Sequence, residues 1–225
     1  MDSIDLIRIA TAVLALLVAI IGHEIMHGWV AYKYGDMTAK NAGRLTINPI
    51  SHIDPVGSLL VPAMMYFVPM LFGSDGGFLF GWAKPVPVNS RTVADNGGYN
   101  AMMQVSLAGI TYNFIVAAFA AAFLLAMSQP LVSDSMIYVF AYFLVMQIVI
   151  INVVLGIFNL LPVPQFDGAH FLMYAALKYN YNAVAEWFYK MERYGMIIVV
   201  LILITPVHQY VLIAPVQFVL QFLLA

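Results

Sequence analysis

Apolar residues are grouped in long runs along this chain, and the runs predict helices that cross a membrane. The runs cover residues 4–32, 56–72, 99–127, 136–161, 194–205 and 210–224. At ~1.5 Å per residue the first is ample to cross ~30 Å of hydrocarbon, whereas the last is short for a crossing. Pro62 and Pro69 interrupt the second run, so hydropathy leaves open whether it spans the membrane or re-enters it. We expect an all-α polytopic membrane protein, a helical bundle of about five to six spans.

The polar intervals between these runs predict turns and short strands. Residues 44–48 alternate polar and apolar side chains, the period of a strand, and the prolines within residues 84–89 favour extended backbone. We expect these segments to form short membrane-associated β-strands or hairpins. Pro162 and Pro164 break the run that begins at residue 136, and a further helix is expected from Asp167 to about residue 178.

Composition supports the membrane assignment and excludes several other classes. Of the 225 residues, 63% are hydrophobic and only 9% are charged, whereas about a quarter of a soluble domain is charged. The lipid bilayer is therefore an expected partner, and the net charge of −2 argues against nucleic acid. The absence of cysteine excludes thiolate metal ligands and disulfides. We expect residues 1–225 to form one transmembrane domain with no PDZ or other soluble domain.

Basic residues predict the orientation of the bundle. If residues 56–72 and their return make an even number of crossings, Asp134 lies alone on one side. The opposite side then carries Lys33, Lys40, Arg44, Lys84, Arg91 and Lys178. The positive-inside rule places that basic side in the cytoplasm.

A histidine pair near the end of the first run provides the strongest chemical signal. His23 and His27 are four residues apart, so both lie on one face of a helix, where two imidazoles can share one zinc ion. Glu24 lies beside them and can activate a water molecule, as in the HExxH pattern of zinc metalloproteases. Ionisable side chains inside a span are costly and usually mark function, so we expect a metal site near the cytoplasmic face.

Zinc normally takes three protein ligands, and Asp167 is the best candidate for the third. It follows a helix break at membrane depth, where irregular backbone survives only beside protein or water, and its carboxylate needs a cationic partner. The alternative is an ordinary helix cap exposed to lipid headgroups.

Two segments together resemble the site-2 protease family of intramembrane zinc metalloproteases. Residues 159–168 (NLLPVPQFDG) look like its NxxPxPxxDG signature, and residues 23–27 look like its HExxH motif. Residues 106–109 followed by Asn113 resemble a third motif, and the segments at 48–57 and 81–89 resemble the compact branch without a PDZ domain. The resemblance covers nearly the whole chain.

The resemblance implies an intramembrane zinc endopeptidase that cuts transmembrane helices of other proteins, in a bacterial or archaeal inner membrane. One zinc ion would be held by His23, His27 and Asp167, with Glu24 as catalytic acid/base. The chain departs from the family at Ile110, where proline is usual. It also departs at His170, one turn after the aspartate, which either tunes the site, contacts substrate or fills a surface role.

Three further polar residues are candidates for binding substrate or stabilising the transition state. Asn159 and Asn113 can donate hydrogen bonds to the substrate chain, although Asn113 can equally form a helix–helix hydrogen bond. His52 can stabilise the oxyanion, but an interfacial loop histidine is the favoured alternative. Two other functions compete with proteolysis: a metal-handling membrane protein, and a catalytically inactive adaptor that binds membrane helices. The oligomeric state is left open.

Overall fold

The computed structural model describes residues 3–55, 57, 83–131 and 133–225, and within them every regular element is helical. Three long helices form the centre: α1 (Ser3–Lys33), α4 (Ser90–Leu125) and α5 (Met136–Leu160). The shorter elements, in chain order, are α2 (Thr38–Asn41), η1 (Pro49–His52), α6 (Asp167–Lys178), α7 (Asn182–Met191), η3 (Glu192–Tyr194), α8 (Gly195–Ile204), η4 (Gln209–Ile213) and α9 (Ala214–Leu223).

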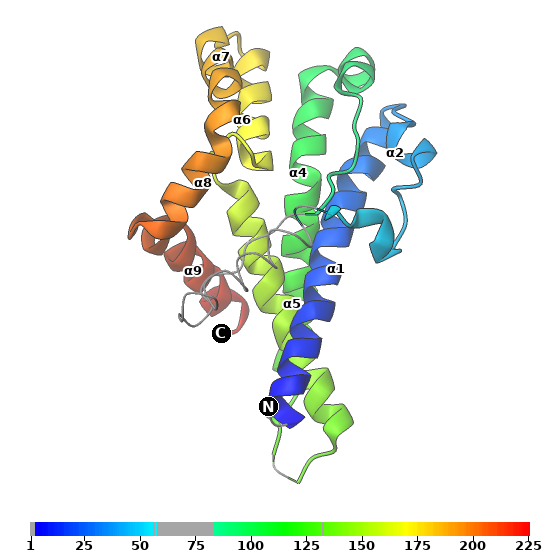
Figure 1. Cartoon of the computed structure of the whole chain (residues 1–225), viewed down its shortest axis with the longest axis vertical. Coiled ribbons are helices and arrows are strands. Elements are labelled where there is room, and N and C mark those ends of the chain that lie inside the picture. The colour runs from blue at the N-terminus through cyan, green and yellow to red at the C-terminus, as the bar shows by residue number, and fades with distance from the viewer. Residues whose placement is uncertain (1–2, 56, 58–82, 132) are drawn as a thin grey trace.

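The central helices run side by side, and each packs against the other two (Figure 1). Small residues line their contacts: Ala15, Ala19 and Ala31 of α1 and Ala117 of α4 are fully buried. Helices in lipid gain little from burying large apolar side chains, because the lipid tails are equally apolar. Close approach of the backbones is favoured instead, and small residues permit it.

Helix α4 begins earlier than the predicted span at residues 99–127, because the chain is already helical from Ser90 and only kinks at Gly98. Gly98 has φ 60° and ψ −159°, which only glycine adopts readily, and the helix continues on both sides of it. The side chain of Asn89 caps the helix start by accepting a hydrogen bond from Thr92 N (3.2 Å).

The break between α5 and α6 matches the prediction from the two prolines. Helix α5 ends at Leu160 and α6 begins at Asp167. A Cβ on Gly168 would overlap the carbonyl group of Leu160, so glycine allows the start of α6 to pack against the end of α5. This packing holds Asp167 beside the central helices. Asp167 is the first residue of α6 and not its cap, which is Phe166.

The number of spans is lower than the sequence predicts within the described residues. Three helices are long and apolar enough to cross a membrane, and a fourth span is counted only if the C-terminal helices on either side of a 91° bend form one crossing. Helices α8 and α9 have 10 residues each, so each covers only about 15 Å. Five to six spans are therefore not confirmed; residues 58–72 of the second predicted run lie outside the described residues.

The predicted strands are not present among the described residues. Residues 44–48 form a bend, and residues 83–89 have no regular secondary structure. The two segments are nevertheless joined, because Arg44 Nη2 donates to the carbonyl oxygen of Lys84 (2.5 Å) and Lys84 N donates to that of His52 (3.0 Å). Side-chain and loop hydrogen bonds thus replace strand pairing.

Asp36 ties the end of α1 to the start of α4. Its carboxylate accepts hydrogen bonds from Thr38 N (2.9 Å) and Asn89 N (2.7 Å). Burial alone would raise the pKa of Asp36, but the hydrogen bonds from Thr38 and Asn89 outweigh it and hold the pKa below its usual range.

Candidate metal centre

The two histidines of α1 and the first residue of α6 meet inside the bundle. Asp167 Oδ2 lies 3.0 Å from His23 Nε2 and 3.1 Å from His27 Nε2, and the two Nε2 atoms are 3.1 Å apart. One ligand atom from each residue therefore falls within a space of 4.8 Å, close enough to contact one ion. The three side chains are buried or nearly buried.

The far side of each imidazole is fixed by a hydrogen bond to α4. His27 Nδ1 lies 2.7 Å from the carbonyl oxygen of Val105, and His23 Nδ1 lies 2.7 Å from Oδ1 of Asn113. Both oxygens only accept, so both Nδ1 atoms carry the ring hydrogen. In each neutral ring, Nε2 then has no hydrogen and carries a lone pair that can bind a metal.

This hydrogen-bond pattern tests whether zinc fits. Two Nε2 lone pairs and a carboxylate oxygen converge, and Asp167 Oδ2 is buried without a hydrogen-bond partner. Three acceptors at such distances repel one another unless a cation lies among them. Two histidine nitrogens and one carboxylate oxygen form a common ligand set for catalytic zinc. The residues therefore fit a zinc ion.

One face of α4 is shaped for the histidines. Val105, Gly109 and Asn113 are spaced four residues apart, so they lie on the same side of the helix. A Cβ on Gly109 would lie 2.5 Å from both His23 Cε1 and His27 Nε2. Glycine at this position therefore gives the rings the room they occupy, and its two neighbours on the face orient them.

Glu24 is held by the irregular segment before α4. Its Oε2 accepts a hydrogen bond from Val86 N at 2.7 Å. Val86 is itself buried and lies in the segment that Arg44 anchors through the carbonyl oxygen of Lys84. The carboxylate is therefore fixed beside the histidine pair by a main-chain donor.

The three further candidates for substrate or transition-state contacts lie in different surroundings. Asn113 is fully buried behind His23 and donates to Asn152 Oδ1 on α5 (2.9 Å), which matches the helix–helix alternative. Asn159 donates to the carbonyl oxygen of Leu155 in its own helix (3.0 Å). His52 is buried in the loop, with Nε2 on the carbonyl oxygen of Thr46 (2.9 Å).

Sequence reasoning did not find three contributors to the site: Asn152, the Val105 carbonyl and the Val86 N–H. The one available signal is the resemblance of residues 106–109 and Asn113 to a family motif, since Val105 lies one turn before Gly109. The Val105 carbonyl and the Val86 N–H are main-chain groups, which the pattern of side chains in a sequence does not reveal.

Comparisons with known proteins agree with this geometry. The model of Peptidase family M50 matches residues 131–204, which include Asp167. A Bacillus subtilis protein with the name "Putative zinc metalloprotease YwhC" is 36% identical over 203 residues, covering 89% of this chain and 83% of that protein. "Putative zinc metalloprotease Rip2" of Mycolicibacterium smegmatis is 26% identical over 185 residues, 82% of this chain and 62% of that protein. No solved structure matches the chain significantly.

Apolar helices that bring an HExxH pair and a distant aspartate together inside a membrane bundle define an intramembrane zinc metalloprotease. The chain belongs to peptidase family M50, the site-2 protease family. It is an integral membrane protein that works on membrane-embedded substrates.

Proposed function

We propose that one zinc ion is held by His23, His27 and Asp167, and that Glu24 is the catalytic acid/base, within a single metalloprotease domain of residues 1–225. The convergence of three acceptor atoms, Asp167 Oδ2 and the Nε2 atoms of His23 and His27, carries this assignment. A metal-handling protein would instead need several sites along a path. In the part of the chain that the structure describes, these three residues form one metal-binding group and no second group occurs.

When bound, zinc would polarise the scissile carbonyl and lower the pKa of a water molecule toward ~7. The chain's own residues supply the remaining steps. Glu24 takes the proton from the attacking water and later gives it to the leaving amine. The Val86 N–H keeps one carboxylate oxygen in place, so the side chain does not have to be ordered during the reaction.

A groove beside the metal-binding group is suited to an unwound substrate segment. It has a volume of about 530 Å³ and is lined by residues of α1, α4 and α6: Met26, Val30, Asn100, Met103, Gln104, Leu107, Ala108, Thr111 and Phe171. Met26 adjoins His27, and Phe171 lies one turn after Asp167. The lining is mostly apolar, as an intramembrane segment requires, with amides that can pair with its exposed backbone.

The extended residues 83–89 remain a second candidate for contact with substrate, by strand addition. Their first half is already occupied, because the Lys84 N–H and C=O and the Val86 N–H are hydrogen-bonded within the protein. The Asn89 N–H is also occupied, since it donates to Asp36. Strand addition is therefore proposed only for Pro87 and Val88. Asn159 remains a proposed contact for the substrate chain, since it immediately precedes the break that leads to Asp167.

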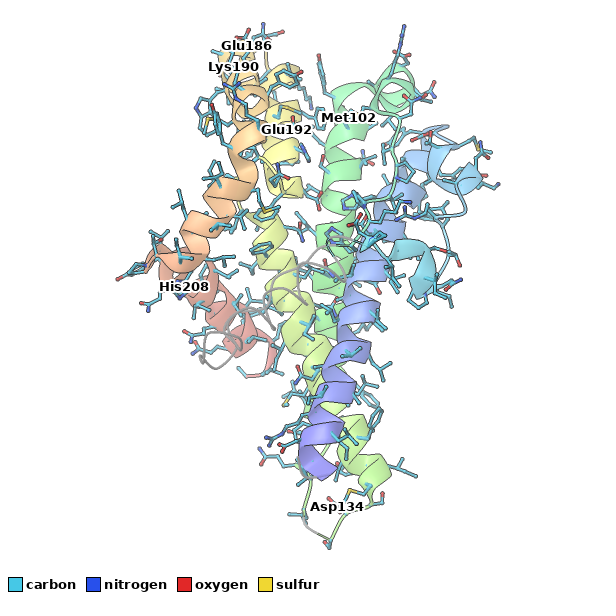
Figure 2. The ribbon with its side chains drawn as sticks, viewed as in Figure 1. Met102, Asp134, Glu186, Lys190, Glu192 and His208 are labelled. Atoms are coloured by element: carbon cyan, nitrogen blue, oxygen red, sulfur yellow. The ribbon has the colours of Figure 1, made fainter. Side chains whose placement is uncertain are left out.

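The proposed orientation puts the metal-binding end of the bundle toward the cytoplasm of a bacterial or archaeal cell. Figure 2 shows Asp134 at one end and Glu186 and Lys190 at the other. The end that carries Lys190 also contains the C-terminus of α1 and the N-terminus of α4 (Figure 1), which bear Lys33 and Arg91. The positive-inside rule favours that end as cytoplasmic.

The experiment that tests the function is cleavage of a model transmembrane helix by the purified chain in lipid vesicles. Wild type should cut the helix, and chelation should stop it. Glu24→Gln should retain zinc and lower kcat by about 10²- to 10⁴-fold, the usual contribution of general acid–base catalysis. A Glu24→Gln protein that cleaves at the wild-type rate would rule out its proposed role.

A further inference from the structure

A series of hydrogen bonds between two buried amide side chains crosses the bundle and ends at His23 of the metal-binding group. Asn152 lies on α5, Asn113 on α4 and His23 on α1, and both asparagines are fully buried. Asn113 Nδ2 donates to Asn152 Oδ1 (2.9 Å), and Asn113 Oδ1 lies 2.7 Å from His23 Nδ1. Asn152 was not among the residues that the motifs indicated.

The acceptors around each amide determine the direction of every hydrogen bond in this series. Asn152 Nδ2 donates to the carbonyl oxygen of Ile148 (2.8 Å), so its Oδ1 faces Asn113. Asn113 Nδ2 has two acceptors, Asn152 Oδ1 and the carbonyl oxygen of Ala19 (3.2 Å). An NH₂ group has two hydrogens, so both are used, and Oδ1 is left to face His23.

The direction of the amide decides which nitrogen of His23 is free for a metal. An oxygen at Nδ1 requires the ring hydrogen there and leaves Nε2 as a lone pair directed toward Asp167. If the Asn113 amide were reversed, its NH₂ would face Nδ1. The ring hydrogen would then move to Nε2 and block the position that a metal needs.

We infer that Asn152 is a positioning residue of the metal centre: by accepting a hydrogen bond from Asn113, it keeps that amide in the direction that selects the zinc-binding tautomer of His23. The inference rests on the proposed role of His23 as a ligand. It differs from simple helix adhesion, because an asparagine pair that only joined α4 to α5 would not affect the tautomer of a residue on α1.

The test compares Asn152→Leu with Asn152→Asp in the full chain in detergent. Leucine has a similar size but no acceptor, whereas aspartate retains an oxygen for Asn113. Zinc affinity is measured by competition with a chelator, and the His23 tautomer by ¹⁵N NMR of the metal-free protein. We expect Asn152→Leu to weaken zinc binding about 10-fold, the lower range for outer-shell partners, and to raise the population of the Nε2–H tautomer. Asn152→Asp gives up the hydrogen bond to the Ile148 carbonyl oxygen but keeps the oxygen that accepts from Asn113. It should therefore retain the wild-type tautomer and lose less zinc affinity than Asn152→Leu.

Repeating the comparison in an Asn113→Asp variant separates the effect on the tautomer from any effect of Asn152→Leu on helix packing. In Asn113→Asp both side-chain oxygens accept, so either orientation of the side chain presents an acceptor to His23 Nδ1. Adding Asn152→Leu to Asn113→Asp should therefore not lower zinc affinity below that of Asn113→Asp alone. If Asn152→Leu fails to fold, Asn152→Ala provides the same comparison without added bulk. Wild-type zinc affinity and an unchanged tautomer in the variant without the acceptor would overturn the inference.

Failure of the inference is distinguishable from failure of the proposed function. His23→Ala serves as the reference and should lose zinc. If wild type and His23→Ala bind zinc equally, the proposed ligand set is wrong. If His23→Ala loses zinc but Asn152→Leu does not, only the role of Asn152 is wrong.

Discussion

Two halves of this molecule are held together by different forces. Helices α1, α4, α5 and α6 meet through buried polar groups that reach from one helix to the next, such as the contact between Asn113 and Asn152. Helices α8 and α9 join the bundle mainly through apolar contacts, among them Val216 with Ala117 and Val199 with Phe166.

In lipid this difference matters more than it would in water. A leucine or valine that leaves a helix contact enters lipid tails of the same polarity, so apolar packing alone sets the position of a helix weakly. A buried amide that loses its partner has no water to replace it. The polar half is therefore expected to have one geometry, which a metal site requires, while the apolar half tolerates substitution. The following variants test this contrast, in order of expected effect.

Removing the carboxylate that joins α6 to α1 should have the largest effect. Asp167→Ala deletes one of three proposed ligands, so zinc affinity should fall by more than about 100-fold, the upper range for an outer-shell partner. Elemental analysis measures the zinc content of the purified protein, which should fall accordingly. Asp134→Ala is the matched control, since Asp134 lies at the opposite end of the bundle (Figure 2) and should not alter zinc content. Normal zinc in Asp167→Ala would remove this residue from the ligand set.

Filling the space behind the histidines should have the next largest effect. In Gly109→Ala the new methyl group would lie 2.5 Å from both rings, which Asn113 and the Val105 carbonyl hold in place. We expect zinc affinity to fall about 10-fold or more, as for the loss of an orienting partner. Thermal stability should fall less than the overlap alone implies, because overpacking costs about 1–3 kcal/mol and the better helix propensity of alanine offsets roughly 1 kcal/mol of it.

Gly156→Ala is the control for a glycine to alanine change in a central helix, because the nearest atoms to its methyl group would belong to the Phe114 ring, at 3.1 Å. It should retain zinc. Equal zinc affinities in the two variants would show that the face of α4 is not fitted to the histidines.

The difference between local and long-range contacts also explains what the sequence could and could not predict. The histidine pair is local, since four residues along one helix set the geometry, and the break at Pro162 and Pro164 marks the start of α6. The sequence could therefore indicate Asp167, which the structure places with the two histidines. It could not indicate Asn152, because the partner of Asn152 depends on how α4 and α5 are rotated about their axes, and an apolar sequence does not fix that rotation.

The predictions that the structure does not confirm concern segments that lack such local signals. Five to six spans were expected from hydropathy, but hydropathy does not register the 91° bend between the C-terminal helices. Residues 44–48 have the alternation of a strand, yet Arg44 is buried with its side chain on the carbonyl oxygen of Lys84. A side-chain hydrogen bond of this kind satisfies the backbone without a strand, and alternation cannot reveal it.

A smaller effect is expected from the main-chain donor to Glu24. Val86→Pro removes the N–H that holds the carboxylate, in a segment where Pro85 and Pro87 already impose extended backbone. We expect kcat to fall about 10-fold, with zinc content unchanged, because one hydrogen bond to a charged group contributes roughly 1.5–3 kcal/mol. Val86→Ala keeps the N–H and should retain most of the activity in the same vesicle assay. Equal kcat values for the two variants would show that this donor is not needed.

The smallest effect is expected in the apolar half, at Val216 of α9. Its side chain is buried against Ala117, Val153 and Ile157, on the same two helices that carry Asn113 and Asn152. Val216→Ala should lower thermal stability by no more than about 1 kcal/mol, since the groups it uncovers meet lipid or detergent tails. Zinc affinity should remain within a factor of about 2 of wild type, because no polar contact of the site depends on α9. A tenfold loss of zinc affinity would instead show that apolar packing in the C-terminal half sets the positions of α4 and α5, and the division between the two halves would then be wrong.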